Sequence, residues 1–565
     1  MLPRHRIRHT MHEPVTPSRG TLIFLALLLA AVWLGTLDFR KLVRPDEGRY
    51  AEIPREMVAT GDWVTPRLNA IKYFEKPPLQ YWATATAYTV FGEHHWTARL
   101  WPALCGFLCV LFTWFAGRRL FGDAVGFYAA LILAASPGFI IVAQINTLDM
   151  GLTLFMTGTL LCLLLALSEP PAKKSPWMIA AWACAALAML SKGLIGIVLP
   201  GMVFVAYLLW HRDWRLLTRL RWSWGLPVFF IIAAPWFVLV QRANPEFFDF
   251  FFIHEHFRRF STGEHRRPGP WWYFVPILVF SMLPWMLYLA RSLADGWKVK
   301  ASGSSHFHPR RFLVLWAVLI FLFFSSSGSK LPSYIVPIFP ALALLMAHTL
   351  VSVKSKVVIW NALVLAVGAA AVILYSPHVT RWGNEKVSAE LYALYTPWLL
   401  AAGVAGLILF LAAAWAGWRG LRTAAVAGIS AGALALTQLA ALGHNVLAPA
   451  SSAHDIAQQI KPHLEPGIPF YSVHNYEQTL PFYIKRPVTL VAYADELAFG
   501  LKQEPALWLP DIPAFVKAWH GHARALAIIE PSTYAKLEKE GLPMQVIATH
   551  VRYAVVKKPV RGLSP

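Results

Sequence analysis

Residues 150–167 read MGLTLFMTGTLLCLLLAL and contain no charged side chain. An apolar run of this length is typical of a helix that crosses a lipid bilayer. The whole chain has a matching composition, because 57% of its 565 residues are hydrophobic and only 14% are charged. Ordinary globular proteins contain roughly 25% charged residues. The composition therefore predicts a multi-span membrane protein and excludes a disordered chain, a coiled coil and a disulfide-rich secreted fold.

Similar apolar runs extend in both directions from this one. The first follows an arginine-rich N-terminal segment like that of a signal peptide, but no small-residue cleavage site follows it, so we interpret it as a retained helix. We expect about thirteen transmembrane helices, near residues 21–37, 97–117, 123–143, 150–167, 176–190, 193–210, 224–241, 271–291, 311–327, 332–350, 357–376, 396–417 and 422–442.

Basic residues are distributed unevenly among the connections between these runs. Every second connection contains Lys or Arg, whereas the short turns 144–149 and 191–193 contain one such residue between them. The positive-inside rule then places the N-terminus in the cytoplasm, and an odd number of spans places the C-terminus outside. The net charge of +21 fits anionic lipid better than nucleic acid in so apolar a chain.

Two outer segments, residues 38–96 and 242–270, are basic and so depart from this pattern. One interpretation is that their cations contact lipid headgroups or the acids of the same loops. The other is that they line an anion-binding cavity that faces outward.

The chain changes character near residue 444. Apolar runs shorten to strand length at 469–473, 489–493, 523–529 and 544–556, and helical patterns at 451–462, 476–484, 511–520 and 531–540 alternate with them. Such alternation is typical of an α/β layer domain. We therefore expect a transmembrane domain at 1–443, with outer loops 38–96 and 242–270, and a small outer α/β domain at 444–565.

The first outer loop contains the densest polar motif, RPDEGRYAEIPREM at residues 44–57. Its apolar positions Tyr50, Ile53 and Met57 recur three and four residues apart, which predicts an amphipathic helix. Asp46 and Glu47 would lie at the N-terminus of that helix, where the macrodipole favours negative charge. Asp46 is then either a functional acid or only an N-cap.

Further candidates lie at the predicted outer boundary. Glu75 and Lys76 precede two prolines that hold them extended, or they form a solvated ion pair. Asp149 opens the fourth span, where an acid needs a partner or water, or it caps the helix. Lys330 and Tyr334 bind one anion together, or they are a snorkelling lysine and an interfacial tyrosine.

The second basic outer loop contributes histidine and arginine. His254 and His256 are candidate ligands of a metal such as zinc. Arg258 and His265 suit phosphate better, because a guanidinium group binds phosphate oxygens in pairs. The metal and phosphate interpretations both stay open at this point.

In combination these motifs resemble the C-type glycosyltransferase superfamily, whose members use polyprenyl-phosphate sugars. The strings PDEGRYAEIPREM, GDWVTPRLNAIKYFEKPPLQYW and SKLPSYIVPIFP, together with HFRRF and PGPWWY, resemble the narrower group of bacterial lipid A aminoarabinose transferases. Those enzymes move 4-amino-4-deoxy-L-arabinose from undecaprenyl phosphate to lipid A phosphates. The resemblance covers residues 20–350, and the later spans and the tail match in layout alone.

The resemblance implies a polytopic α-helical inner-membrane enzyme, with a periplasmic active site and C-terminal α/β domain, that contributes to polymyxin resistance. We expect a monomer that binds membrane lipids and no nucleic acid. We expect that no cofactor is required, with a divalent metal such as zinc as the alternative. We assign catalysis to Asp46 and Asp149, donor and phosphate binding to Arg49, Tyr50, Tyr73, Glu75, Lys76, Arg258, His265, Lys330 and Tyr334, and metal binding, if any, to Glu75, His254 and His256.

A phosphate acceptor is already ionised near neutral pH, so the reaction needs no strong general base. Departure of polyprenyl phosphate leaves positive charge on the sugar, which a carboxylate stabilises while cations stabilise the leaving phosphate. We expect a single inverting displacement. The alternatives are a related transferase that acts on another sugar or on protein hydroxyls, and a lipid or sugar transporter.

Overall fold

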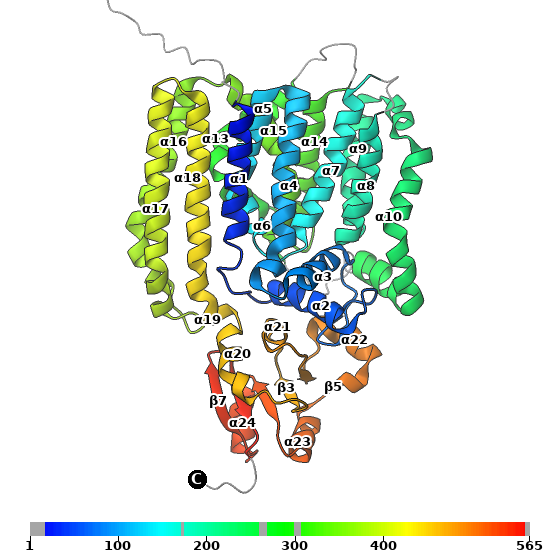
Figure 1. The fold of residues 1–565 in the computed structure, drawn as a ribbon. Coiled ribbons are helices and arrows are strands. Elements are labelled where there is room, and N and C mark those ends of the chain that lie inside the picture. The colour runs from blue at the N-terminus through cyan, green and yellow to red at the C-terminus, as the bar shows by residue number, and fades with distance from the viewer. Residues whose placement is uncertain (1–16, 171–174, 259–267, 299–306, 560–565) are drawn as a thin grey trace, which may run out of the picture.

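The computed structural model describes residues 17–170, 175–258, 268–298 and 307–559, with the backbone alone for 254–258. A bundle of long helices carries a small α/β domain at one end, and two helices of the first outer loop, α2 (Asp46–Thr60) and α3 (Leu79–Phe91), lie between them (Figure 1). The predicted separation into a helical membrane part and an α/β tail is therefore found in the structure.

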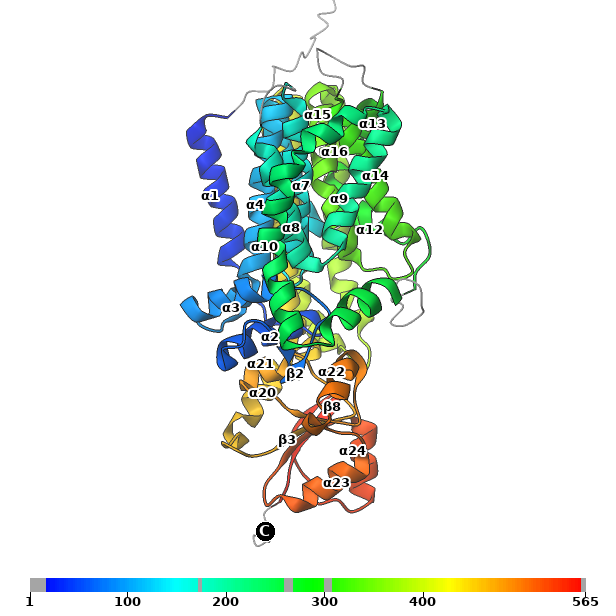
Figure 2. The same ribbon diagram turned by 90° about the vertical axis from the view of Figure 1, so that its right-hand side faces the viewer.

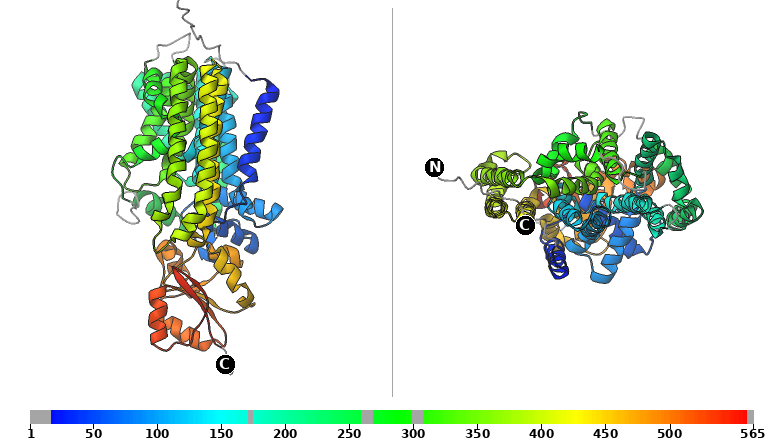
Figure 3. Two further views of the ribbon diagram at one scale, coloured as in Figure 1. Left: turned by 90° about the vertical axis from the view of Figure 1, so that its left-hand side faces the viewer. Right: turned by 90° about the horizontal axis from the view of Figure 1, so that it is seen from above.

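The helices of the bundle follow the predicted apolar runs. They are α1 (Arg19–Gly35), α4 (His95–Phe121), α5 (Asp123–Ala134), α6 (Pro137–Ala143), α7 (Asp149–Ser168), α8 (Pro176–Lys192), α9 (Ile195–His211), α10 (Trp222–Ala243), α12 (Phe274–Ser281), α13 (Met286–Trp297), α14 (Pro309–Ser326), α15 (Phe339–Ser352), α16 (Ser355–Tyr375), α17 (Ala389–Trp418) and α18 (Arg422–Gly443). Viewed from above, α16–α18 form one side of the bundle and α8–α10 the other (Figure 3).

Within the described residues, eight helices are long and apolar enough to cross a membrane, or up to ten if each of two bent pairs is one span. Three shorter apolar helices, α1, α8 and α9, occupy positions where spans were also predicted. The split between 176–190 and 193–210 is confirmed. A total of thirteen spans requires all three short helices and both bent pairs to cross, and it stays a prediction.

Two of the predicted continuous spans are broken in the structure. The run at 123–143 bends by 66° between α5 and α6, and the run at 271–291 bends by 81° between α12 and η3–α13 (Leu283–Trp297). Pro137 opens α6 and Pro284 lies in the 3-10 turn before α13. A proline lacks the N–H that would continue the helical ladder, which explains both breaks.

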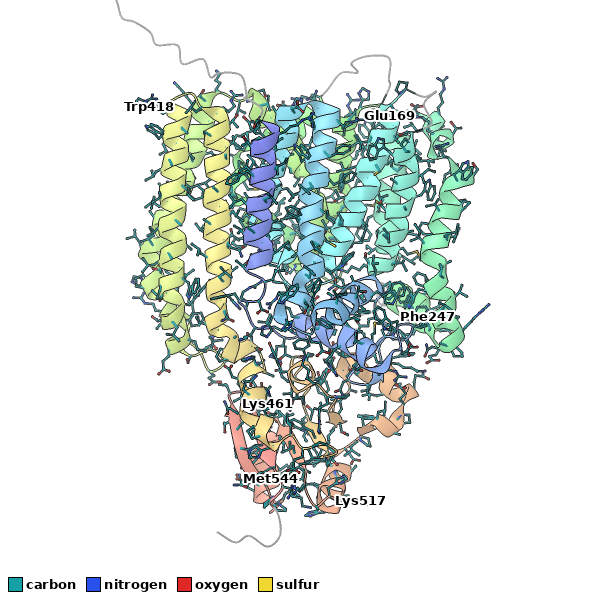
Figure 4. The ribbon with its side chains drawn as sticks, in the orientation of Figure 1. Glu169, Phe247, Trp418, Lys461, Lys517 and Met544 are labelled. Carbon is teal, nitrogen blue, oxygen red and sulfur yellow. The ribbon has the colours of Figure 1, made fainter. Side chains whose placement is uncertain are left out.

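The two ends of the bundle match the predicted alternation of connections. Glu169 and Trp418, which adjoin connections predicted to be cytoplasmic, lie at the end away from the α/β domain (Figure 4). Phe247, in a predicted outer loop, lies at the end near that domain. Lys461, Lys517 and Met544 lie within the domain itself.

The C-terminal domain contains a six-stranded sheet in the order β5-β4-β3-β6-β8-β7. Its strands are β3 (Phe470–Val473), β4 (Thr489–Val491), β5 (Trp508–Leu509), β6 (Leu526–Ile529), β7 (Gln545–His550) and β8 (Tyr553–Lys557), and its longer helices are α20 (His454–Ile460), α21 (Leu480–Ile484), α22 (Ala498–Gln503), α23 (Ile512–Gly521) and α24 (Pro531–Lys539). Strands β3–β6 are parallel, and β8 pairs antiparallel with both β6 and β7.

The predicted single strand at 544–556 is wrong, because the chain turns at residues 551–552 and forms the hairpin β7–β8. The two-residue strand β5 was not predicted, since it is too short to show a pattern. The four helical patterns at 451–462, 476–484, 511–520 and 531–540 each contain a helix of the domain.

The domain shares a hydrophobic cluster with the first outer loop. Tyr50 and Ile53 of α2 belong to the same buried cluster as Leu480 of α21 and Leu490 of β4. Figure 2 shows α2 and the hairpin strand β2 (Ile71–Lys72), which pairs with β1 (Arg67–Leu68), directly against the domain. The predicted amphipathic helix is therefore no surface helix: residues 47–57 are all buried.

Candidate active site

The position of α2 is fixed by a buried ion pair behind its first turn. Arg99 donates to both carboxylate oxygens of Glu47, at 2.7 and 2.8 Å. The N–H groups of Val43 and Asn146 also donate to Glu47, each at 3.0 Å. Burial alone would raise the pKa of Glu47, but the charge and hydrogen bonds of Arg99 lower it below its ordinary value. Glu47 is therefore a structural carboxylate with its acceptor sites filled from two directions.

Asp46, the preceding residue, faces a different environment. Its side chain is 36% exposed, and it accepts a hydrogen bond from Arg49 Nη1 at 3.0 Å. The residue before it, Pro45, is the N-cap, and no side chain caps the helix. Asp46 is thus not the N-cap that the sequence left as an alternative. It is a half-open carboxylate at the positive end of a helix.

The C-terminal domain supplies a second acid to this site. Glu496 forms an ion pair with the other terminal nitrogen of Arg49 and accepts a hydrogen bond from Gln478 Nε2 at 3.2 Å. Burial raises the pKa of Glu496, and the guanidinium of Arg49 opposes that rise. A Cβ added at Gly48 would lie 2.5 Å from the backbone of Gln478. Only glycine permits this approach, which brings Glu496 to α2.

Aromatic side chains line the same space. The Arg49 guanidinium lies over the rings of Tyr50 and Tyr73, at 5.7 and 6.0 Å from their centroids, and the Tyr50 and Tyr81 rings lie 6.2 Å apart. Burial raises the pKa of Tyr50, Tyr73 and Tyr81. The phenols are neutral and therefore remain hydrogen-bond donors.

Several buried polar atoms on these residues and on segments that contact α2 or α3 have no hydrogen-bond partner within the described part of the chain. They are Tyr73 Oη, Tyr81 Oη, Arg49 Nε, Gln478 Oε1, Gln80 Oε1 and Asn146 Nδ2. Buried polar atoms in native proteins are rarely left unpaired, and a cluster of them indicates a ligand or ordered water. Donors and acceptors are both present, which suits a ligand rich in hydroxyl and amino groups.

Glu75 and Lys76 adjoin this space. Lys76 Nζ lies 3.7 Å from Glu75 Oε2 and donates to the Glu75 carbonyl at 2.8 Å. Each side chain is 19% exposed, so the pair is not the fully solvated contact that the sequence left as an alternative. The charge of Glu75 acts on Tyr50, Tyr73, Tyr81 and Glu496, which places it within the same cluster.

A second ammonium group, after that of Lys76, comes from the helix bundle. Lys192, the last residue of α8, forms an ion pair with Asp149 at the start of α7, and its ammonium lies 4.7 Å from the ring centroid of Tyr334. Lys192 is within electrostatic range of Asp46. Asp149 is therefore engaged with a lysine and does not cap its helix, since α7 has no side-chain cap. Its observed partner is Lys192, and the assignment of Asp149 to catalysis stays a prediction.

This arrangement combines a half-open carboxylate with two ammonium groups and a polar, aromatic-walled space. Cations of this kind stabilise the negative charge of a leaving phosphate, and a carboxylate stabilises positive charge on a reacting carbon. The unpaired hydroxyl and amide atoms suit a sugar between them.

Comparisons with known proteins identify relatives that are sugar transferases. Residues 456–558 match the family model of the aminoarabinose transferase C-terminal domain, and residues 75–238 match that of dolichyl-phosphate-mannose-protein mannosyltransferase. A transferase of Pseudomonas fluorescens, named undecaprenyl phosphate-alpha-4-amino-4-deoxy-L-arabinose arabinosyl transferase 2, is 33% identical over 404 residues, which are 68% of this chain and 67% of that protein. The chain belongs to the aminoarabinose transferase family.

Two further relatives extend the match. The undecaprenyl phosphate-alpha-4-amino-4-deoxy-L-arabinose arabinosyl transferase of Pseudomonas paraeruginosa is 35% identical. The match covers 59% of this chain and 60% of that protein. The crystal structure of ArnT from Cupriavidus metallidurans bound to undecaprenyl phosphate superposes with a TM-score of 0.91 at 39% identity, covering 97% of this chain and 100% of that one. As an aminoarabinose transferase family member, the chain is a multi-pass protein of the bacterial inner membrane with a C-type glycosyltransferase fold.

In this family member the ammonium of Lys330 is held by backbone carbonyls. Its Nζ donates to the carbonyls of Phe324, Ser325 and Ser327 at 3.3, 2.6 and 2.7 Å. Lys330 therefore neutralises the C-terminal carbonyls of α14 and is only 5% exposed, so it does not snorkel. Its partner in the prediction, Tyr334, faces Lys192 instead. A phosphate role for Lys330 stays a prediction.

The second basic outer loop lies largely outside the described residues. The backbone of Asp249–Arg258 forms a π-helix, but the side chains of His254, His256 and Arg258 are not described, and His265 falls in the undescribed segment 259–267. Among the described residues, no group of three or more His, Cys, Asp and Glu side chains is placed to hold a metal. Metal binding by Glu75, His254 and His256 therefore stays a prediction.

Sequence reasoning missed three of the residues that build this site. Lys192 is the single charge in an outer turn, and that isolation was the available signal. Arg99 opens the second predicted span and carries no motif of its own. Glu496 follows a strand of the tail, 450 positions from Asp46, so the sequence offers no link between them.

Proposed function

We propose that this protein transfers 4-amino-4-deoxy-L-arabinose from undecaprenyl phosphate to a phosphate of lipid A. The site faces the periplasm, with the N-terminus in the cytoplasm and the C-terminus in the periplasm. The single observation that carries the proposal is the half-open Asp46, within electrostatic range of Lys192, at a space lined by unpaired buried polar atoms. Family membership and a solved relative bound to undecaprenyl phosphate support the choice of donor.

Lys76 and Lys192 hold the donor phosphate, and Arg258 of the second basic outer loop also binds it. The sugar occupies the polar space, where the hydroxyls of Tyr73 and Tyr81 donate to it. Its ammonium group is attracted by the carboxylates of Glu75 and Glu496, which pair with Lys76 and Arg49 respectively.

The acceptor phosphate oxygen attacks the anomeric carbon from the face opposite the donor phosphate. The bond from that carbon to the donor phosphate breaks, and undecaprenyl phosphate leaves with the electron pair. Attack from the opposite face inverts the configuration of the anomeric carbon. No proton has to move, because the acceptor oxygen is already ionised. Asp46 stabilises the positive charge that develops on the sugar and orients the acceptor.

A metal at Glu75, His254 and His256 belongs to the same proposal as an optional element, and no step depends on it. Transfer by purified protein with and without a chelator measures any metal requirement. The monomeric state is likewise proposed, and light scattering in detergent measures it.

The test uses lipid A mass spectrometry in cells that lack their own transferase and make the donor. We expect an added aminopentose with the parent chain and none with Asp46→Asn at equal expression. No added mass with either protein, despite folded protein and available donor, would assign the site to a different sugar or acceptor. Purified protein offered a peptide hydroxyl acceptor then distinguishes the related transferases from this one.

A further inference from the structure

The acid that we assign to catalysis lies between two contacts with the C-terminal part of the chain. Two residues before Asp46, the Arg44 N–H donates to the carbonyl of Ser451 at 2.9 Å. Two residues after it, Gly48 packs so closely on Gln478 that an added Cβ would lie 2.5 Å from the Gln478 backbone. The position of Asp46 therefore depends on how the segments around Ser451 and Gln478 are held.

These two segments are linked to each other by the side chain of Glu477. The Thr479 hydroxyl donates to Glu477 Oε1 at 3.0 Å and accepts the N–H of Ala453 at 2.8 Å. Glu477 and Thr479 flank Gln478 in the turn between β3 and α21, and Ala453 follows Ser451 by two residues. The carboxylate of Glu477 thus orients the hydroxyl that joins the two segments.

Glu477 also faces the cation that precedes Asp46. Arg44 Nε lies 3.9 Å from Glu477 Oε2, and Arg552 Nη2, from the turn between β7 and β8, lies 3.7 Å from the same oxygen. Both distances exceed that of a direct hydrogen bond, so the attraction is between whole charges. Glu477 is buried, whereas the Arg44 side chain is 41% exposed. Loss of the Glu477 charge would therefore release Arg44 toward solvent.

The charge of Glu477 changes within the range of neutral pH. Burial raises the pKa of Glu477 to about 7, although the charge of Arg44 and the hydrogen bond from Thr479 oppose the rise. A carboxylate in water titrates about three pH units lower. The attraction between Glu477 and Arg44 is therefore present at pH 8 and largely lost at pH 6.

The titratable groups beside Glu477 are neutral near neutral pH. They are Tyr553 and His550, on the strands that flank the Arg552 turn. Burial raises the pKa of Tyr553 and lowers that of His550. His550 Nδ1 accepts the Arg552 N–H at 3.2 Å and Nε2 donates to a backbone carbonyl at 2.6 Å, as a neutral imidazole does. Asp455 of α20 acts on His550 but is not among the groups that shift Glu477.

We propose that Glu477 is a positioning residue for Asp46. Its ionised carboxylate attracts Arg44 and orients the Thr479 hydroxyl, and so holds the residues that precede α2 against the C-terminal domain. When Glu477 is protonated, Arg44 is released and Asp46 loses its fixed position. The inference rests on the proposed function for the role of Asp46, and it adds a control of turnover by the ionisation state of the C-terminal domain.

The test compares kcat of the parent and of Glu477→Gln at two pH values. The variant keeps an acceptor for the Thr479 hydroxyl but has no charge at any pH. We expect its kcat to be about tenfold below that of the parent at pH 8, because Asp46 is misplaced, with the donor KM unchanged. At pH 6 most of the parent carboxylate is protonated, so the difference should shrink to about twofold. Protonation of the acceptor phosphate affects both proteins alike and cancels in the ratio.

A second variant separates positioning from a loss of stability. Arg44→Gln changes a partly exposed side chain and keeps the backbone hydrogen bond of residue 44, so we expect it to fold. It should lower kcat at pH 8 as much as Glu477→Gln does, and the double variant should be no worse than either. Glu56→Gln is the matched control, because Glu56 is also a buried acid of raised pKa between α2 and the domain, at the other end of the helix. Its kcat should equal that of the parent at both pH values.

Hydrogen exchange tests the positioning without substrate, by mass spectrometry of the full chain in detergent. The Arg44 N–H should exchange about tenfold faster in Glu477→Gln than in the parent at pH 8, and at the parental rate in Glu56→Gln. A kcat ratio that is the same at pH 6 and pH 8, unchanged exchange in Glu477→Gln, or effects of Arg44→Gln and Glu477→Gln that multiply would each overturn the proposal. A parent that transfers no aminoarabinose to lipid A would refute the proposed function, whereas faster exchange in Glu477→Gln would still support this role of Glu477.

Discussion

Asp46 and Glu47 are neighbours in the sequence, yet they occupy opposite environments. Glu47 is 1% exposed and accepts four hydrogen bonds from a guanidinium and two backbone amides. Asp46 is half open, and within the described residues its ion-pair partner is Arg49, which it shares with Glu496. The fully satisfied acid fixes the backbone, and the partly satisfied acid next to it is left available for a substrate.

This comparison separates positioning from chemistry at one helix terminus. A buried ion pair is expensive to break but takes no part in the reaction. A half-exposed acid contributes little to stability and can respond to charge that develops beside it. Substitutions at the two positions should therefore affect different measurements.

The largest expected effect is on turnover, in Asp46→Asn. We expect kcat to fall about 10²–10⁴-fold, with donor binding and melting temperature unchanged, because Arg49 keeps Glu496 as its partner. Initial rates of sugar transfer in detergent and undecaprenyl phosphate binding measure the two quantities. Asp123→Asn is the matched control: Asp123 also opens a helix and pairs with an arginine, Arg118, but at the other end of the bundle. Turnover retained by Asp46→Asn would remove Asp46 from the mechanism.

The second effect is on stability, in Glu47→Gln. Loss of this carboxylate leaves the buried Arg99 charge without its counter-ion, and we expect a loss of about 3–5 kcal/mol in the free energy of unfolding. Thermal unfolding in detergent, followed by tryptophan fluorescence, measures it. Glu385→Gln on an exposed loop is the control. If Glu47→Gln has the same melting temperature as the parent but a strongly reduced kcat, Glu47 is the acid that takes part in the reaction and the assignment of the two acids is reversed.

The sequence could locate α2 but could not tell its two first acids apart. Tyr50, Ile53 and Met57 recur at helical spacing, so the helix and the place of Asp46 in its first turn were predictable. The environments of Asp46 and Glu47 are set by Glu496 and Arg99, which come from other parts of the chain. Periodicity carries no information about such contacts.

The same limit explains the pairing of Asp149. An acid at the end of an apolar run must have a partner, but nothing local shows that the partner is Lys192, 43 positions later. The broken spans were missed for a different reason. Proline within an apolar run is compatible with both a kinked and a broken helix, and the packing around it decides which forms.

The third prediction tests whether Asp149 acts through Lys192. We expect Lys192→Gln to lower kcat about 10²–10³-fold, because an oriented cation on the leaving phosphate is lost. The double variant Asp149→Asn/Lys192→Gln should be no worse than Lys192→Gln, since Asp149 has no lysine left to orient. Initial rates for the four proteins of this cycle measure it. Effects that multiply would show that Asp149 contacts a substrate itself.

The smallest effect concerns a second acid pair of α2, deeper against the C-terminal domain. Burial, together with the charge of Glu52, raises the pKa of Glu56 to about 8, whereas Glu52 keeps its ion pair with Arg55. An acid whose pKa is raised by folding contributes stability that is fully present below the unfolded pKa, near 4.3, and lost as the pH rises through the folded value. The parent should therefore lose stability between about pH 4.3 and pH 8.

The variant Glu56→Gln keeps an acceptor for the Ala70 N–H, which donates to Glu56 at 2.8 Å. Its melting temperature should be a few degrees above that of the parent at pH 9 and equal to it at pH 5. Melting temperatures across this range measure the difference, with Glu385→Gln as the control; equal slopes for parent and Glu56→Gln would show that Glu56 is ionised in the folded protein.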